Sequence, residues 1–164
     1  MASTSYLARV IFKEHTDSGD ATDFSGSYKL LVKAKSIPAP ASAPNTVEST
    51  TLEDDTQTFE MGIKTSDARE ITGNLDKEYL QNINALAGKK LDIFHLYGTD
   101  GVGGVAKYAY VGQATATPND VSGIDSILEM TVTVIPNTVA VECTDEYTVT
   151  DNGDGTLTVA SVGA

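Results

Sequence analysis

The stretch LDIFHLYGTDGVGGVAKYAYVGQATAT, residues 91–117, contains two apolar runs on either side of a glycine-rich segment. Each run has the length and the apolar content of a strand, so we expect strands at 91–97 and 105–117. The segment GTDGVGG between them predicts a turn, because glycine and aspartate favour tight backbone reversals. It does not predict a phosphate-binding loop, since a strand rather than a helix follows it.

Two further strand patterns lie toward the C-terminus. SILEMTVTVIP, residues 126–136, alternates between two sets of side chains, and we expect it to pair with 105–117 as its neighbour. EYTVTDNGDGTLTVA, residues 146–160, has alternating runs on both sides of Asn-Gly and Asp-Gly, a strong hairpin signal. An isolated two-stranded hairpin is only marginally stable in water, so this one is expected to pack on the domain or on a neighbouring subunit.

A single helix is predicted from DKEYLQNINALAGKK, residues 76–90. Asp76 is a suitable N-cap, and Glu78 lies near the positive end of the helix dipole. The apolar residues follow helical spacing and form one stripe, and Gly88 is suited to the position just after a helix. We therefore expect a helix at about 76–87 whose apolar stripe packs on a sheet.

The N-terminal half contributes further strands, expected at 6–13, 28–37 and 68–75. In the second of these, Leu30, Val32 and Ala34 are expected to share one face. Taken together, the elements predict a mainly β fold, a β-sandwich or flattened barrel with one flanking α-helix (about 76–87), a long loop (about 38–58) and a C-terminal β-hairpin. We expect a single domain over 1–164, in which 144–164 is a hairpin extension.

The middle of the chain carries a long polar insertion. IPAPASAP, residues 37–44, is followed by TVESTTLEDDTQTFEMGIKTSDA, residues 46–68. The prolines favour extended chain, and no core-forming residue occurs before Phe59. A strand is expected to resume at 56–64, with Phe59, Met61 and Ile63 on one face. Long loops of this kind are either disordered or ordered by a partner, and Val47 and Leu52 are spaced apolar anchors suited to docking on another copy.

Charge and cysteine content exclude several classes of protein. The 164 residues carry a net charge of −12, and from Tyr108 onward there are eight acids and no base. Such a field repels nucleic acid and anionic membranes. The single cysteine, Cys143, rules out a disulfide within the chain. We also expect no signal peptide and no membrane-spanning helix, and folding in a cytoplasm.

Candidate catalytic and metal-binding residues are isolated in the sequence. His15 and His95 have no ligand or triad spacing around them, and a structural role is expected for both. Acids near Cys143 would raise the pKa of its thiol, which disfavours a nucleophile. The segment DNGDG, residues 151–155, departs from calcium-loop spacing and is explained by turn formation. We therefore expect no catalytic residue, no metal, no cofactor and no enzymatic activity.

The insertion resembles the corresponding segment of major tail tube proteins of long-tailed (siphophage-type) bacteriophages. These proteins carry a Val/Ile-Glu-x-Thr-x-Leu-Asp-Asp-like run followed by a glycine and a strand. The residues of this chain that match the run are Val47, Glu48, Thr50, Thr51, Leu52, Asp54, Asp55 and Gly62. The order of the remaining elements is also similar, whereas the final hairpin is not a general feature of that family.

The resemblance implies a structural protein of the virion tail, assembled in the host bacterial cytoplasm. Its subunits would form hexameric rings that stack into a tube, around a tape-measure protein and between tail-tip and tail-terminator proteins. DNA would pass through during ejection without specific binding, and no membrane anchor is implied. The ring-stacking loop would comprise Val47, Glu48, Thr50, Thr51, Leu52, Asp54 and Asp55. Asp120, Asp125 and Glu129 are the candidate acids of the lumen.

Two other classes of function are weighed against the tube subunit. An Ig-like β-sandwich that acts as a binding or adhesion module would suit the terminal hairpin and the acidic charge, and it is the main alternative. It predicts a stable monomer at high concentration. An enzyme is the weakest hypothesis, because only a site assembled from distant positions could support it.

Overall fold

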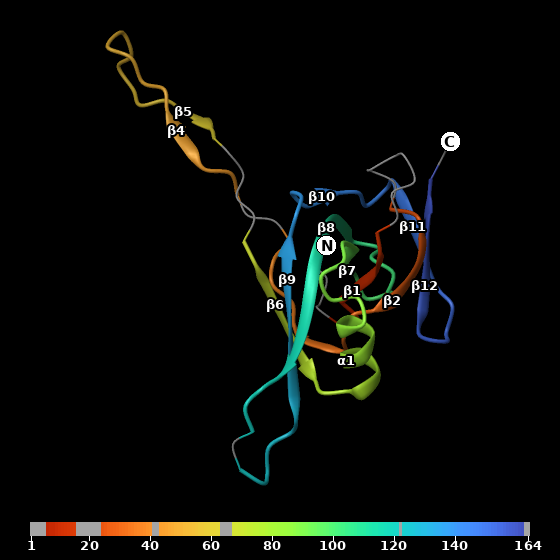
Figure 1. Cartoon of the computed structure of the whole chain (residues 1–164). Coiled ribbons are helices and arrows are strands. Elements are labelled where there is room, and N and C mark those ends of the chain that lie inside the picture. The colour runs from red at the N-terminus through yellow and green to blue at the C-terminus, as the bar shows by residue number, and fades with distance from the viewer. Residues whose placement is uncertain (1–5, 16–23, 41–42, 63–66, 122, 163–164) are drawn as a thin grey trace.

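The computed structural model describes residues 6–15, 24–40, 43–62, 67–121 and 123–162 (Figure 1). Within them lie one helix and twelve strands. The helix is α1 (Lys77–Asn84), and the strands are β1 (Arg9–Glu14), β2 (Gly26–Leu30), β3 (Ala34–Ser36), β4 (Thr46–Glu48), β5 (Phe59–Met61), β6 (Arg69–Asn74), β7 (Leu91–Tyr97), β8 (Ala106–Pro118), β9 (Glu129–Pro136), β10 (Val141–Glu142), β11 (Tyr147–Asp151) and β12 (Thr156–Ser161).

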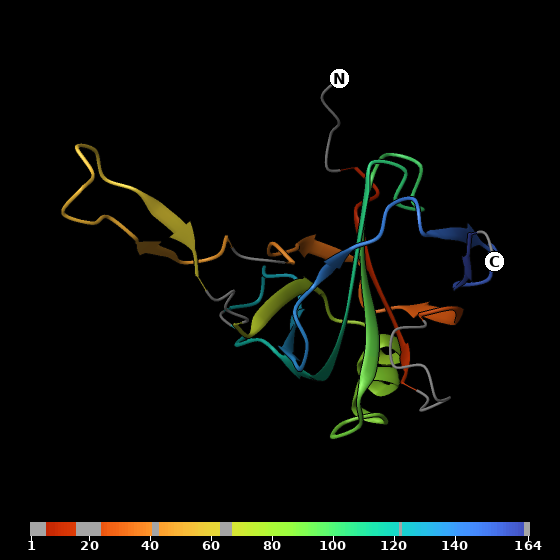
Figure 2. The same cartoon turned by 90° about the horizontal axis from the view of Figure 1, so that it is seen from above.

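The main sheet is antiparallel and curls back on itself. Its strand order is β11-β12-β2-β1-β7-β8-β9-β6-β3, and β10 pairs with β8. β2 and β3 are consecutive in the chain, yet β2 pairs with β1 and β3 pairs with β6 at the far end of the row. One short segment therefore joins both sides of the curled sheet, as Figures 1 and 2 show. The mainly β flattened-barrel fold expected from the sequence is confirmed.

The long strand β8 links the two halves of this barrel. Its first half pairs with β7 up to Gly112, and its second half pairs with β9 from Gly112 onward. A Cβ atom at Gly112 would lie 2.8 Å from the backbone oxygen of Ile135, so the change of partner requires glycine at this crossing. The predicted pairing of 105–117 with 126–136 is confirmed, and the predicted turn after 91–97 joins two strands that pair with each other.

The helix fills the wall of the barrel beside the second half of β8, beyond the start of β7 at Leu91. Asp76 is the N-cap, since its carboxylate accepts a hydrogen bond of 3.0 Å from the Glu78 amide. Ile83 is fully buried in the barrel core. The side chain of Asn84 donates to the carbonyl of Ala116 and accepts from its amide, at 3.3 and 3.2 Å, and so occupies the free edge of β8. The predicted helix is confirmed, but it ends at Asn84 rather than at residue 87.

Two hydrophobic cores lie on opposite faces of β1, β7 and β8. The first fills the barrel and consists of Val10, Phe12, Leu31, Val32, Ile71, Ile83, Leu91, Ile93, Tyr110, Ala114, Ala116, Met130, Val132 and Val134. The second lies between the barrel and the C-terminal hairpin and consists of Ile11, Tyr28, Phe94, Leu96, Ala109, Cys143, Tyr147, Val149, Leu157 and Val159. This second core is sandwich-like, because two layers of strands enclose it.

The predicted C-terminal hairpin forms and lies on the same chain. β11 and β12 pair with each other, and β12 extends the main sheet by pairing with β2. The ring of Tyr147 packs edge to face against Phe94 at 5.7 Å between ring centroids. Burial of its apolar face on the barrel explains the stability that an isolated hairpin would lack.

The strand predicted at 28–37 is interrupted, and its predicted face is wrong. Adjacent residues Leu31 and Val32 are both buried, whereas Leu30 is only partly buried. The reason is topological: the chain leaves β1 after Leu30 and crosses to β6, so residues 31–33 belong to no strand. Alternation along one strand does not hold across such a change of partner.

The strand predicted at 56–64 is shorter than expected and does not return to the main sheet. β5 pairs only with β4, in a separate two-stranded sheet. Phe59 is 57% exposed and Met61 is 80% exposed, so neither is a core residue of this chain. Ile63, predicted on the same face, lies outside the described residues.

Candidate assembly surface

The insertion forms a projecting hairpin, residues 46–61, which we name the arm. β4 and β5 pair through Thr46–Met61, Val47–Glu60 and Glu48–Phe59. Just beyond them, the amide of Ser49 donates to the carbonyl of Thr58 at 2.8 Å. Figures 1 and 2 show the arm extending away from the barrel in both views. Most of the segment expected as a long loop at 38–58 therefore forms the first strand and the tip of a hairpin.

Polar side chains shape the tip of the arm. The carboxylate of Asp54 accepts hydrogen bonds from the Thr51 amide at 2.8 Å and the Thr51 hydroxyl at 3.1 Å. The hydroxyl of Thr50 accepts from the amide of Thr58 at 2.9 Å. Thr50, Thr51 and Asp54, to which the resemblance assigns ring stacking, thus have an internal structural role. Their polar pairing holds a turn that no apolar core supports.

The surface of the arm is both apolar and acidic. Because cross-strand partners share a face, Phe59 and Met61 lie on one face of the arm and Val47 on the other. Val47 is 56% exposed, and Leu52 at the tip is fully exposed. The arm contains five acids and no base, a charge of −5, from Glu48, Glu53, Asp54, Asp55 and Glu60. Large exposed apolar side chains on a small projecting element are typical of an interaction site.

A buried arginine binds the chain on both sides of the arm, at residues 39–40 and at residue 67. We name these two places the legs of the arm. Arg69, the first residue of β6, donates from Nε to the carbonyl of Ala39 at 2.9 Å and from Nη2 to the carbonyl of Pro40. On the other leg, Nη1 donates to the carbonyl of Asp67 at 3.2 Å. The guanidinium also lies over the ring of Tyr110, 5.2 Å from its centroid. One side chain therefore determines where the two legs leave the barrel.

The ring that supports Arg69 is itself held by His95. The Nε2 atom of His95 lies 2.9 Å from the Tyr110 hydroxyl, and both side chains are buried. Burial and, to a lesser extent, the nearby charge of Arg69 lower the pKa of His95 to about 3. Burial also raises the pKa of Tyr110. Both rings are thus neutral at neutral pH, and they form a structural support for the arm.

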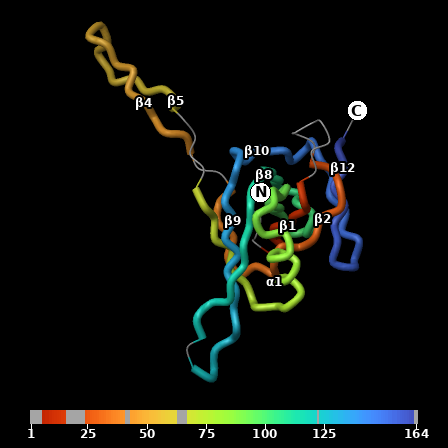
Figure 3. Tube along the Cα trace, in the orientation of Figure 1, coloured from red at the N-terminus to blue at the C-terminus, as the bar shows by residue number. Residues whose placement is uncertain are grey.

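A second projection, residues 119–121 and 123–128, joins β8 to β9 and is named the β8–β9 tip. It lies at the opposite end of the molecule from the arm (Figure 3). Its exposed apolar side chains are Val121, Ile124, Ile127 and Leu128. The candidate lumen acids gather here, because Asp120 and Asp125 are exposed on the tip and Glu129 begins β9. Glu129 also forms an ion pair with Lys35 at 3.0 Å.

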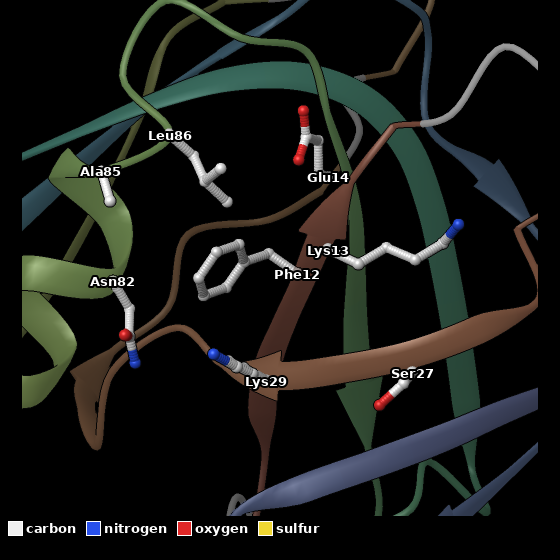
Figure 4. A pocket seen from close by; sticks show the side chains of 8 residues that line it. All are labelled: Phe12, Lys13, Glu14, Ser27, Lys29, Asn82, Ala85 and Leu86. Carbon is white, nitrogen blue, oxygen red and sulfur yellow. The ribbon is translucent and has the colours of Figure 1, made fainter.

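A hollow of about 280 Å³ lies between α1 and the strands β1 and β2 (Figure 4). Phe12 points from β1 toward the helix, whereas Lys13 points to the other side. Two of its three charged residues are paired: Lys13 Nζ lies 3.1 Å from the buried carboxylate of Asp92, which His15 also contacts at 2.7 Å, and Glu14 lies 3.7 Å from Lys89 Nζ. The third, Lys29, has no acid beside it among the described residues of the lining, so the hollow does not bring an acid and a base together as a reactive centre would.

The remaining reactive group is the thiol of Cys143, which is buried in the second core. Burial raises its pKa to about 11, and Glu146 and Glu142 act in the same direction. The thiol is thus protonated at neutral pH and poorly nucleophilic. Among the residues that the structure describes, no three His, Cys, Asp or Glu side chains are grouped as a metal site would require.

Sequence reasoning found the exposed residues of the arm but missed Arg69 and Tyr110. The available signal was the register of β6, in which Arg69 shares the buried face with Ile71 and Gly73. An arginine at an inward position of a strand indicates a buried partner.

Comparison with known proteins identifies no relative. No protein-family model matches the chain, and no curated protein matches it. In the described part of the chain, no helix is long and apolar enough to cross a membrane.

Proposed function

We propose that this protein is a structural subunit that assembles with copies of itself through the arm, and that the assembly is the tail tube of a bacteriophage. The observation that carries the proposal is the arm, which presents Val47, Leu52, Phe59 and Met61 to solvent away from the barrel. The barrel of the same chain covers neither of its faces.

The stability of the arm depends on what covers it. Two-stranded sheets without a covering layer are marginal in water, and this one has three cross-strand pairs. Contact with a second copy would bury the apolar side chains on both faces and stabilise the hairpin. Because the arm is one surface and its receptor on the next copy is another, the contact is head-to-tail. Such contacts produce rings when they close and filaments when they do not.

Two features favour a tail tube among such assemblies. The arm contains the run from Val47 to Asp55 on which the resemblance to tail tube proteins rests. The charge of −12 would let DNA slide through a tube without adhering to its wall. In this proposal the subunits form stacked hexameric rings, enclose a tape-measure protein and end at tail-tip and tail-terminator proteins. Asp120, Asp125 and Glu129 contribute to the acidic lumen.

The test compares the full chain with a variant in which a short Gly-Ser turn replaces residues 47–60. Both are concentrated and examined by electron microscopy and light scattering. We expect hollow filaments or six-fold rings from the full chain. We expect a monomer from the variant, and its far-UV circular dichroism spectrum should show that the barrel is still folded.

Two results would contradict this proposal. Filaments of normal length from the shortened variant would show that the arm is not needed for self-assembly. A full chain that remains monomeric at high concentration and in the presence of tail-tip complexes would favour the binding-module alternative.

A further inference from the structure

A groove of about 570 Å³ opens in the barrel wall between the start of β1 and β3. It exists because the chain leaves β1 after Leu30 and crosses to β6, so that β1 and β3 diverge. We name it the split groove. The residues that line it are Tyr6, Leu7, Ala8, Arg9, Leu30, Val32, Lys33, Ala34, Lys35 and Asn74.

One wall of the split groove is an open strand edge, and the other is the start of β1 with the residues that precede it. β3 is the last strand of the sheet and pairs only with β6. The start of β1 pairs with β7 on one side through Arg9 and Val10. On its other side, the last described contact with the crossing segment is the bond of 2.9 Å from the Leu31 amide to the Val10 carbonyl. Unpaired backbone groups of this kind bind extended chain by β-augmentation.

The charge of the split groove is opposite to that of the arm. Arg9, Lys33 and Lys35 line it, and no acid does. Arg9 forms an ion pair with Asp151, and Lys35 forms one with Glu129, each with a distance of 3.0 Å between nitrogen and oxygen. Lys33 is exposed and appears in none of the ion pairs of the described residues. The groove is thus a basic, apolar-lined channel on a protein whose net charge is −12.

We infer that the split groove of one copy receives the arm of a second copy. The inference rests on the proposed self-assembly and names the surface that it uses. The arm is extended, acidic and apolar, and the groove offers the open edge of β3, cations and apolar side chains, so the two are complementary in all three properties. The arm of the same chain points away from the barrel, which makes a second copy the occupant (Figure 2).

The test is a charge reversal with rescue. Lys33→Glu/Lys35→Glu reverses two charges of the groove, and Glu53→Lys/Asp55→Lys reverses two charges at the tip of the arm while it leaves the turn-forming Asp54 intact. Each variant alone should raise the critical concentration for assembly by about tenfold or more, because like charges then face each other. The chain with all four changes should assemble again. An equimolar mixture of the groove variant and the arm variant should also assemble, since each then offers what the other lacks.

Lys77→Glu/Lys90→Glu is the matched control, because it changes the net charge equally at two exposed residues outside the groove. It should assemble at nearly the wild-type concentration. If the groove variant assembles as well as this control, the groove is not the receptor, although self-assembly through the arm would stand. If the wild-type chain does not assemble even in the presence of tail-tip complexes, the inference and the proposed function both fall.

Carboxylate-to-amine crosslinking of the wild-type chain gives a second measurement that does not depend on any variant folding. We expect intermolecular crosslinks from Glu53 or Asp55 to Lys33 or Lys35, detected by mass spectrometry in a mixture of isotopically light and heavy chains. Intermolecular crosslinks from the arm to Lys77, Lys89 or Lys90 instead would place the receptor elsewhere and overturn the inference.

Discussion

Replacing Arg69 with methionine should separate the arm from the barrel without removing the barrel core. The substitution keeps a long side chain over the Tyr110 ring but removes the three donors that reach Ala39, Pro40 and Asp67. A buried carbonyl that loses its donor costs about 1–3 kcal/mol. Two of the three carbonyls lie on the first leg, where Pro40 is buried.

The magnitude follows from these contacts. The buried Pro40 carbonyl without a donor contributes about 1–3 kcal/mol. The carbonyls of the exposed residues Ala39 and Asp67 can bond to water and contribute less, and relief from burying a charge offsets part of the loss. We therefore expect the free energy of unfolding of Arg69→Met to fall by about 1–3 kcal/mol, measured by denaturant titration with circular dichroism. Arg69→Lys should fall by a similar amount, because lysine cannot reproduce the planar fork that serves both legs.

A second measurement distinguishes this mechanism from a general loss of packing. The charge of Arg69 contributes to the low pKa of His95. By NMR, the pKa of His95 should rise in Arg69→Met and stay low in Arg69→Lys. A stability loss below about 0.5 kcal/mol together with an unchanged pKa of His95 would refute the role that we assign to Arg69.

Three further predictions concern the barrel. His95 has a pKa of about 3 in the folded chain and 6.5 in the unfolded chain, so between these pH values only the unfolded chain binds the proton. The free energy of unfolding should therefore fall as the pH decreases from about 6.5, by up to about 1.4 kcal/mol per pH unit. His95→Gln should remove most of that slope between pH 6 and 4.5, and an unaltered slope in thermal melts would contradict this account. Gly112→Ala should lower the free energy of unfolding by about 1–3 kcal/mol in a denaturant titration, since its Cβ would meet the Ile135 carbonyl at 2.8 Å. Gly153→Ala is the control and should cost less despite its positive φ, because no atom lies within 4 Å of the added Cβ. Asn84→Ala should lower the free energy of unfolding by about 1–2 kcal/mol and increase hydrogen exchange at the amide of Ala116, because this edge of β8 loses the side chain that bonds to it. Unchanged exchange at Ala116 would contradict this role of Asn84.

Much of the fold was predictable because its signals are local. Alternation along 126–136 found β9, and the Asn-Gly and Asp-Gly pairs found the hairpin of β11 and β12. The N-cap of the helix was found at Asp76 because a capping side chain bonds within its own first turn. For the candidate site, Val47 and Leu52 could be singled out, since an apolar residue among acids and threonines has no core to enter.

The errors have a common physical origin. The faces of 28–37 were wrong because a strand that changes partner loses its alternation, and the partners β1 and β6 are far apart in the chain. Phe59 and Met61 were placed in the main sheet because alternation reports a strand but not the sheet to which it belongs. Arg69 was missed because its acceptors lie about thirty residues away on the first leg of the arm.

The sequence by itself determined the class of the protein: a mainly β chain with one capped helix, an acidic surface and a polar insertion between two strand-rich parts. Local periodicity, capping and turn chemistry are sufficient for these features, since each depends on neighbours within a few residues. Only the tertiary structure decided that residues 26–36 close the barrel, that Arg69 holds both legs of the arm, and that the split groove opens between β1 and β3. Each of these depends on contacts between distant segments, which form when the barrel closes.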